Sequence, residues 1–118
     1  MRYIALALPL VLACSIGARG NELAFDLNLA RGHLPEDMRL IRIHQGDAVK
    51  LRWTSDRPLT LHVHGYNIEK RVMPGVPTEM NFTAYATGRF PVHVHGTAGS
   101  GGGGHEEAPL AVIEVYPR

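Results

Sequence analysis

The segment LTLHVHG, residues 59–65, alternates apolar and polar side chains and ends on a glycine. Nearly the same pattern returns as FPVHVHG at residues 90–96. Alternation with a period of two is typical of a β-strand with one buried face, because successive side chains of a strand point to opposite faces. Each segment therefore predicts a strand that carries two histidines on the face opposite its apolar residues and stops at its glycine.

The rest of the chain contains further short strand patterns and no convincing helical periodicity. The other predicted strands are residues 23–29, 40–43, 49–53, 80–84 and 110–116. Turn signals separate the predicted strands at Gly32, Gly46, Pro58, Pro74, Gly75 and Gly88. About seven evenly spaced strands in roughly one hundred residues predict an all-β fold, a Greek-key β-sandwich or small barrel, in a single domain.

Composition excludes several classes of protein and of site. The 118 residues include 12 Lys+Arg and 11 Asp+Glu. The resulting net charge of +1 gives the chain no strong electrostatic attraction to nucleic acid. A hydrophobic content of 45% is enough to build a core. The single cysteine excludes an internal disulfide, a CxxC redox pair and a metal site with several thiolates. The seven histidines are the unusual feature of the composition.

The first twenty residues have the pattern of an export signal. A basic start is followed by the uncharged apolar run YIALALPLVLA at residues 3–13 and then by small residues. We therefore expect a signal peptide at residues 1–20, a folded domain at residues 21–118, and a periplasmic or other extracytoplasmic location. VLAC at residues 11–14 resembles a bacterial lipobox, which would anchor the chain to a membrane through a lipid on Cys14. Ordinary cleavage near Ala18 or Gly20 is the alternative, as is a buried N-terminal helix.

The paired histidines are the residues that could bind a metal ion. His62 with His64, and His93 with His95, are i and i+2 pairs, so each pair lies on one face of its strand about 7 Å apart. Each pair can bind one divalent ion or share an ion with a neighbouring strand. Four neutral imidazoles without a thiolate suit Cu(II) first, then Zn(II) or Ni(II). The alternative is two pairs of exposed strand histidines that bind nothing.

His105 is a further candidate ligand, because it follows the glycine-rich segment at residues 99–104 and precedes two glutamates. That segment is either a passive linker or a loop whose closing is completed by a ligand bound through its flanking histidines. We expect Glu106 and Glu107 to form a solvated face of this loop. We expect His33 and His44 to be surface residues, since both occur in turn-like sequence.

From residue 43 to residue 116 the chain resembles a cupredoxin-like domain of exported bacterial proteins. The resemblance is carried by IHQGDAVKLRW at 43–53, SDRPLTLHVHGYNIE at 55–69, VMPGVP at 72–77, FTAYATGRFPVHVHG at 82–96, and the closing LAVIEVYP. It implies a β-sandwich with both HVHG strands side by side in one sheet and a copper site at one end. The family's blue-copper cysteine falls on Val94, and its methionine falls near Pro109. A thiolate-bound electron-transfer centre is therefore excluded.

These observations favour a periplasmic copper-binding protein, a carrier or sequestering factor, with Cu(II) held by histidines alone and no substrate turnover. The expected partners are the metal ion and a periplasmic or membrane copper protein, and not nucleic acid. One alternative is a cupredoxin-like accessory module that binds no metal within an exported complex. A more remote resemblance is to copper/zinc superoxide dismutase, with His93, His95 and His105 as ligands, but the cysteines of that family are absent.

Overall fold

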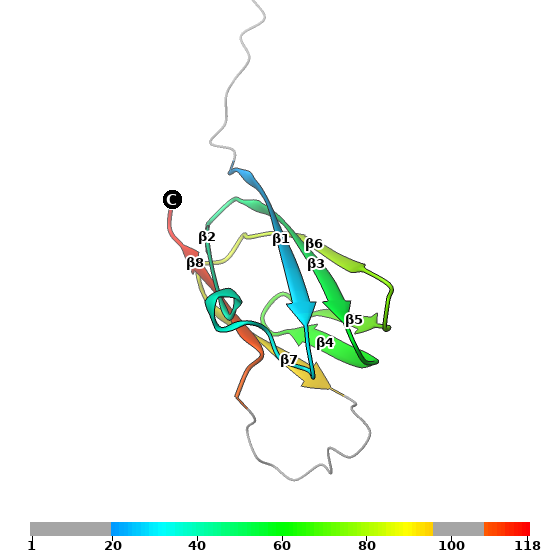
Figure 1. Ribbon diagram of the computed structural model, residues 1–118. Helices are drawn as coiled ribbons and strands as arrows, with labels where there is room; N and C mark the ends of the chain where they lie inside the picture. Colours follow the sequence, from blue (N-terminus) through cyan, green and yellow to red (C-terminus); the bar gives the residue numbers. More distant parts are fainter. Residues whose placement is uncertain (1–19, 96–107) are drawn as a thin grey trace, which may run out of the picture.

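The computed structural model of the protein describes residues 20–95 and 108–118. Within them the chain forms two β-sheets (Figure 1). Of the predicted leader only Gly20 is described, and Cys14, residues 99–104 and His105 lie outside the described residues. In the described ranges no helix has the length and apolar character needed to cross a membrane.

Eight strands account for most of the described residues. In chain order they are β1 (Glu22–Leu29), β2 (Leu40–His44), β3 (Ala48–Ser55), β4 (Leu59–Val63), β5 (Ile68–Val72), β6 (Thr78–Thr83), β7 (Gly88–His95) and β8 (Ala111–Tyr116). A single 3₁₀ turn, Glu36–Met38, interrupts the strands in the described part of the chain. All seven predicted strands are present, within a few residues of their expected bounds, and β5 is the additional one.

The strands form a three-stranded sheet in the order β1-β3-β6 and a five-stranded sheet in the order β2-β8-β7-β4-β5. The pairs β1/β3 and β2/β8 are parallel, and the other neighbours are antiparallel. The two sheets stack as layers (Figure 1). Strands β4 and β7 are neighbours in the five-stranded sheet although a long stretch of sequence separates them. The expected adjacency of the two HVHG strands is therefore found.

The inward faces of both sheets meet in one apolar core. The side chains at its centre that are at most 1% exposed include Leu27, Leu51, Trp53 and Met80 from the three-stranded sheet and Ile43, Leu61, Val63, Val92 and Ile113 from the five-stranded sheet. Burial of each such side chain contributes roughly 1.5–3 kcal/mol relative to leaving it in water. One continuous core between the two sheets confirms the predicted all-β sandwich.

Strand β5 was not predicted because its sequence, IEKRV, places three charged residues in succession. It lies at the edge of the five-stranded sheet and pairs only with β4. Of its residues only Val72 is fully buried. Charged side chains on an edge strand hinder pairing with another chain, and they also remove the alternation that identifies a strand from sequence.

Candidate metal centre

The register of β4 against β7 brings the two histidine pairs onto one face of the five-stranded sheet. His62 lies directly opposite His93, and His95 lies opposite Thr60. Leu61 and Val63, which alternate with the histidines, are completely buried. Because alternate strand residues share a face, the imidazoles point outward from the sandwich. This is the orientation that the sequence pattern predicts.

The turn that follows β4 holds the fourth imidazole close to the other three. The backbone N–H of His64 donates to the carbonyl of Pro91 at 3.0 Å, which extends the pairing with β7 beyond the end of the strand. Gly65 then has a φ of +90°, and a Cβ atom at this position would lie 2.3 Å from Cδ1 of Phe90. Only glycine fits both the left-handed backbone and the close approach of this ring.

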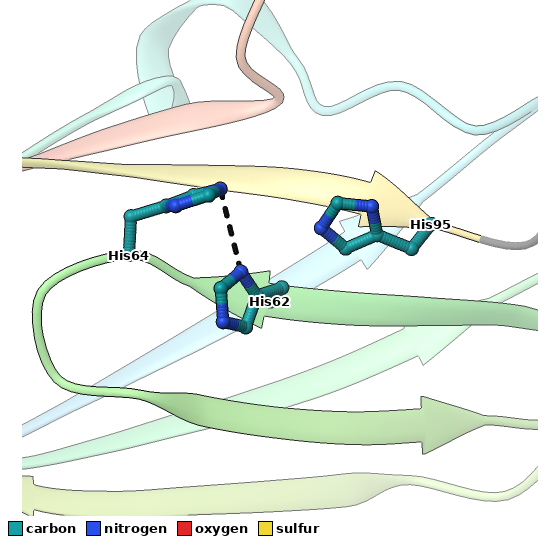
Figure 2. Close-up of side chains that lie close together, drawn as sticks. All are labelled: His62, His64 and His95. Carbon is teal, nitrogen blue, oxygen red and sulfur yellow. Dashed lines mark hydrogen bonds between the residues drawn. The ribbon is translucent and has the colours of Figure 1, made fainter. Parts of the chain in front are cut away.

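Three of the histidines place ring nitrogens together (Figure 2). Nδ1 of His62 and Nε2 of His64 are 3.3 Å apart. His62, His64 and His95 each offer a nitrogen, and these atoms all lie within 4.8 Å of one another. Two nitrogens bound to one ion at about 2.0–2.1 Å are separated by roughly 2.9–3.4 Å for bond angles between square and tetrahedral. The separation of the first two nitrogens already falls within that interval, so small rotations of His95 would complete a three-nitrogen site.

His93 lies beside this group as a packing neighbour. Its ring centroid is 4.9 Å from that of His64, and the two rings are nearly perpendicular at 89°. The ring of His95 lies 5.3 Å from that of His62. The four histidines thus form one cluster in which His62, His64 and His95 converge. Within the described residues His93 does not join the group of three nitrogens.

The remaining histidines are distributed differently. His105 lies outside the described residues. His44 ends β2, an edge strand on the far side of the sheet, and its ring centroid is 6.1 Å from that of Tyr116. His33 forms an isolated bridge with Ala30. Both His33 and His44 are exposed, as their sequence context indicates.

The surroundings of His64 in the cluster favour the uncharged form of its imidazole. Partial desolvation among the neighbouring rings lowers the pKa of His64 below its ordinary value. The positive charges that His62, His93 and His95 carry when protonated lower this pKa further. A metal ligand must be a neutral imidazole, so His64 keeps its ligand form at lower pH than an isolated histidine does.

Two charged residues of β5 flank the cluster, and the sequence patterns did not indicate them. Glu69 lies opposite His62, and Arg71 lies opposite Thr60. Their positions depend on β5 and its register, which the charged sequence of that strand concealed. The signal that could have indicated a hairpin is the sequence HGYN at residues 64–67, because Gly and Asn favour short turns that bring the next segment back along β4.

Comparison with known proteins gives a consistent fold. No family model and no curated protein matches the sequence. A chain of a heme-copper terminal oxidase matches with a TM-score of 0.59 and 22% identity, over 81% of this chain and 65% of that chain. A copper-binding protein in its apo form matches with a TM-score of 0.61 and 9% identity, over 84% of this chain and 92% of that chain. A multi-copper oxidase from Pseudomonas thermotolerans matches with a TM-score of 0.60 and 21% identity, over 84% of this chain and 30% of that chain.

The chain therefore spans slightly under two thirds of the oxidase chain and less than one third of the multi-copper oxidase, but nearly the whole of the small copper-binding protein. At these identities the shared property is the architecture of two stacked sheets. The predicted resemblance is confirmed at the level of the fold: the described residues form a β-sandwich with cupredoxin-like architecture.

Proposed function

We propose that the protein binds copper through His62, His64 and His95 and acts as a carrier or sequestering factor outside the cytoplasm. The observation that carries the proposal is the convergence of three imidazole nitrogens within 4.8 Å on the outer face of one sheet. Imidazole is a good ligand for Cu(II), Zn(II) and Ni(II), and Cu(II) binds most tightly in the Irving–Williams order. The similarity in fold to several copper proteins supports the choice of copper.

The exposure of the site suits a carrier better than a catalyst. His95 is exposed and His62 is half-buried, so an ion held here keeps coordination positions open to water or to a ligand from another protein. Ligand exchange with a partner copper protein then needs no opening of the core. Resemblance in fold to a chain of a heme-copper terminal oxidase supports a periplasmic or membrane copper protein as the partner. No substrate turnover is part of this proposal.

Copper titration of the full chain in a Cys14→Ser background tests the proposal. We expect one Cu(II) per chain near neutral pH, a weak d–d absorption, nitrogen hyperfine structure in the EPR spectrum, and no intense thiolate charge-transfer band. His62→Ala and His95→Ala should each weaken binding strongly. Affinity should also fall as the pH drops through the imidazole range, since protonated histidine cannot ligate.

His33→Ala and His44→Ala are matched controls, because both residues are exposed histidines outside the cluster. Neither change should alter the affinity. Binding of far less than one Cu(II) per chain by the unmodified cluster would contradict the proposed function and favour an accessory module without a metal. Preferential binding of Zn(II) or Ni(II) under competition would keep the site but replace the metal.

A further inference from the structure

Glu69 lies directly opposite His62 in the antiparallel pair of β4 and β5. Val72 of the same strand is completely buried, so residues of the opposite parity, including Glu69, point outward with the histidines. Directly opposed residues have Cβ atoms about 4.5–5.5 Å apart. A glutamate side chain adds enough length to reach the ring of its neighbour. The carboxylate is therefore within reach of His62 on the outer face of the sheet.

The orientation of His62 leaves one ring nitrogen for such a contact. Nδ1 faces His64, with 3.3 Å between Nδ1 and Nε2 of the second ring. Figure 2 shows the other nitrogen of His62 on the side away from His64, toward the strand that follows the turn. That strand is β5. If Nδ1 binds the metal, Nε2 carries the proton and points toward the strand that presents Glu69.

The cation of β5 that shares the outer face with Glu69 is directed elsewhere. Arg71 lies opposite Thr60, one step along the same face, and its Nε lies 3.4 Å from Sδ of Met73. Among the described residues no ion pair joins Arg71 to Glu69, and no hydrogen bond joins Glu69 to His62. The carboxylate is exposed and free to rotate toward His62 once that ring has a fixed proton to donate.

We infer that Glu69 is a positioning residue for His62, an inference that rests on the proposed copper site. The carboxylate of Glu69 accepts a hydrogen bond from Nε2–H of His62 while Nδ1 of His62 binds the metal. This bond fixes the tautomer and the ring plane of His62 and makes its ligating nitrogen more basic. Loss of such a partner in other metal sites costs about 10–100-fold in metal affinity. Glu69 itself does not ligate the metal.

The test compares Glu69→Ala, Glu69→Gln and the control Glu79→Ala in the full Cys14→Ser chain. Glu79 is also an exposed strand glutamate, but it lies in β6 of the other sheet. Competition with a chelator should show Cu(II) binding about 10–100-fold weaker for Glu69→Ala. Glu69→Gln, which keeps an acceptor oxygen, should recover most of the affinity, and Glu79→Ala should equal the parent chain.

Two spectroscopic measurements separate a positioning residue from a ligand. At saturating copper, the EPR spectra of Glu69→Ala and the parent should show the same number of coordinated nitrogens and no loss of an oxygen ligand. In the chain loaded with diamagnetic Zn²⁺, NMR should show a slowly exchanging Nε2–H on His62 that exchanges faster in Glu69→Ala.

Several outcomes would overturn the inference. They are unchanged affinity in Glu69→Ala, a changed ligand set in its EPR spectrum, or metal-bound Nε2 in His62. Each of these leaves copper binding by the parent intact. Failure of the parent to bind copper would instead reject the proposed function, so the two failures are distinguishable.

Discussion

His64 is the histidine of the cluster whose pKa is lowered by its surroundings. Its ring lies 4.3 Å from that of His62 and 4.9 Å from that of His93, measured between centroids. Desolvation by this packing and the charges of the neighbouring histidines lower its pKa. The unfolded chain therefore binds a proton at His64 more readily than the folded chain does. The contribution of His64 to stability is present above the unfolded pKa and decreases as the pH falls through that value.

We predict that an NMR titration of the metal-free chain gives His64 a midpoint below the ordinary histidine pKa of about 6.5. His95→Ala removes one of the neighbouring positive charges and should raise the pKa of His64, while desolvation by the remaining rings persists. A His64 midpoint at or above the ordinary histidine value would contradict this account.

The histidine pairs were predictable from sequence, but their convergence was not. An HxH pattern within a strand fixes the face on which the side chains lie. Which histidines meet depends on the register between β4 and β7, a pairing that residues close in sequence do not determine. The register places His62 opposite His93, yet the ring of His62 lies near that of His95. Side chains lean along their strands, so backbone opposition alone does not identify the ligand group.

At the scale of the element, the turn after β4 is sterically constrained at Gly65. We predict that Gly65→Ala destabilises the fold by more than about 1 kcal/mol, because a side chain there meets both a left-handed backbone and the ring of Phe90. It should also weaken copper binding, since Gly65 follows His64 directly. Urea denaturation and copper titration measure the two effects.

Gly75→Ala is the matched control for this turn. Gly75 also has a positive φ, +74°, but a Cβ atom there would have nothing within 4 Å. Its substitution should carry the backbone cost alone and leave copper affinity unchanged. Equal losses of stability in the two variants would show that Phe90 does not restrict the turn.

The strands themselves were largely predictable because most have a buried face that leaves a period of two in the sequence. In β3 the alternation is clear, with Val49, Leu51 and Trp53 buried in turn. Strand β5 lacks this signal because it lies at an edge and carries Glu69, Lys70 and Arg71 in succession. The residue proposed to position His62 thus lies in the element that hydrophobic patterning could not identify.

At the scale of the whole molecule, Asp47 joins three distant parts of the chain. It is 1% exposed, and its carboxylate accepts backbone N–H bonds from Asn21 at 2.9 Å and from His44 at 2.8 Å. Arg118 pairs with the same carboxylate. Burial alone raises the pKa of Asp47, but the two backbone donors and the Arg118 guanidinium outweigh this effect and lower it below the ordinary value.

This connection lies far from the candidate metal centre. The β2–β3 turn that contains Asp47 follows His44, which pairs with Tyr116 at the end of β8. Strand β7 begins beside that end, with Gly88 opposite Val115, and runs away from it toward His95. Asp47 and the candidate metal centre therefore lie toward opposite ends of β7, so a substitution at Asp47 should alter stability without altering metal binding.

We predict that Asp47→Asn lowers the free energy of unfolding by about 1–3 kcal/mol near neutral pH, because it removes a buried hydrogen-bonded charge whose partner Arg118 is partly in water. Since the folded pKa of Asp47 is depressed, its contribution is present above the unfolded pKa of 3.8 and is lost as the pH falls through the lower folded value. The stability difference between the variant and the parent should therefore shrink below about pH 4. Copper affinity should stay unchanged at neutral pH, and a parallel loss of both properties would show that the two ends of the sandwich are coupled.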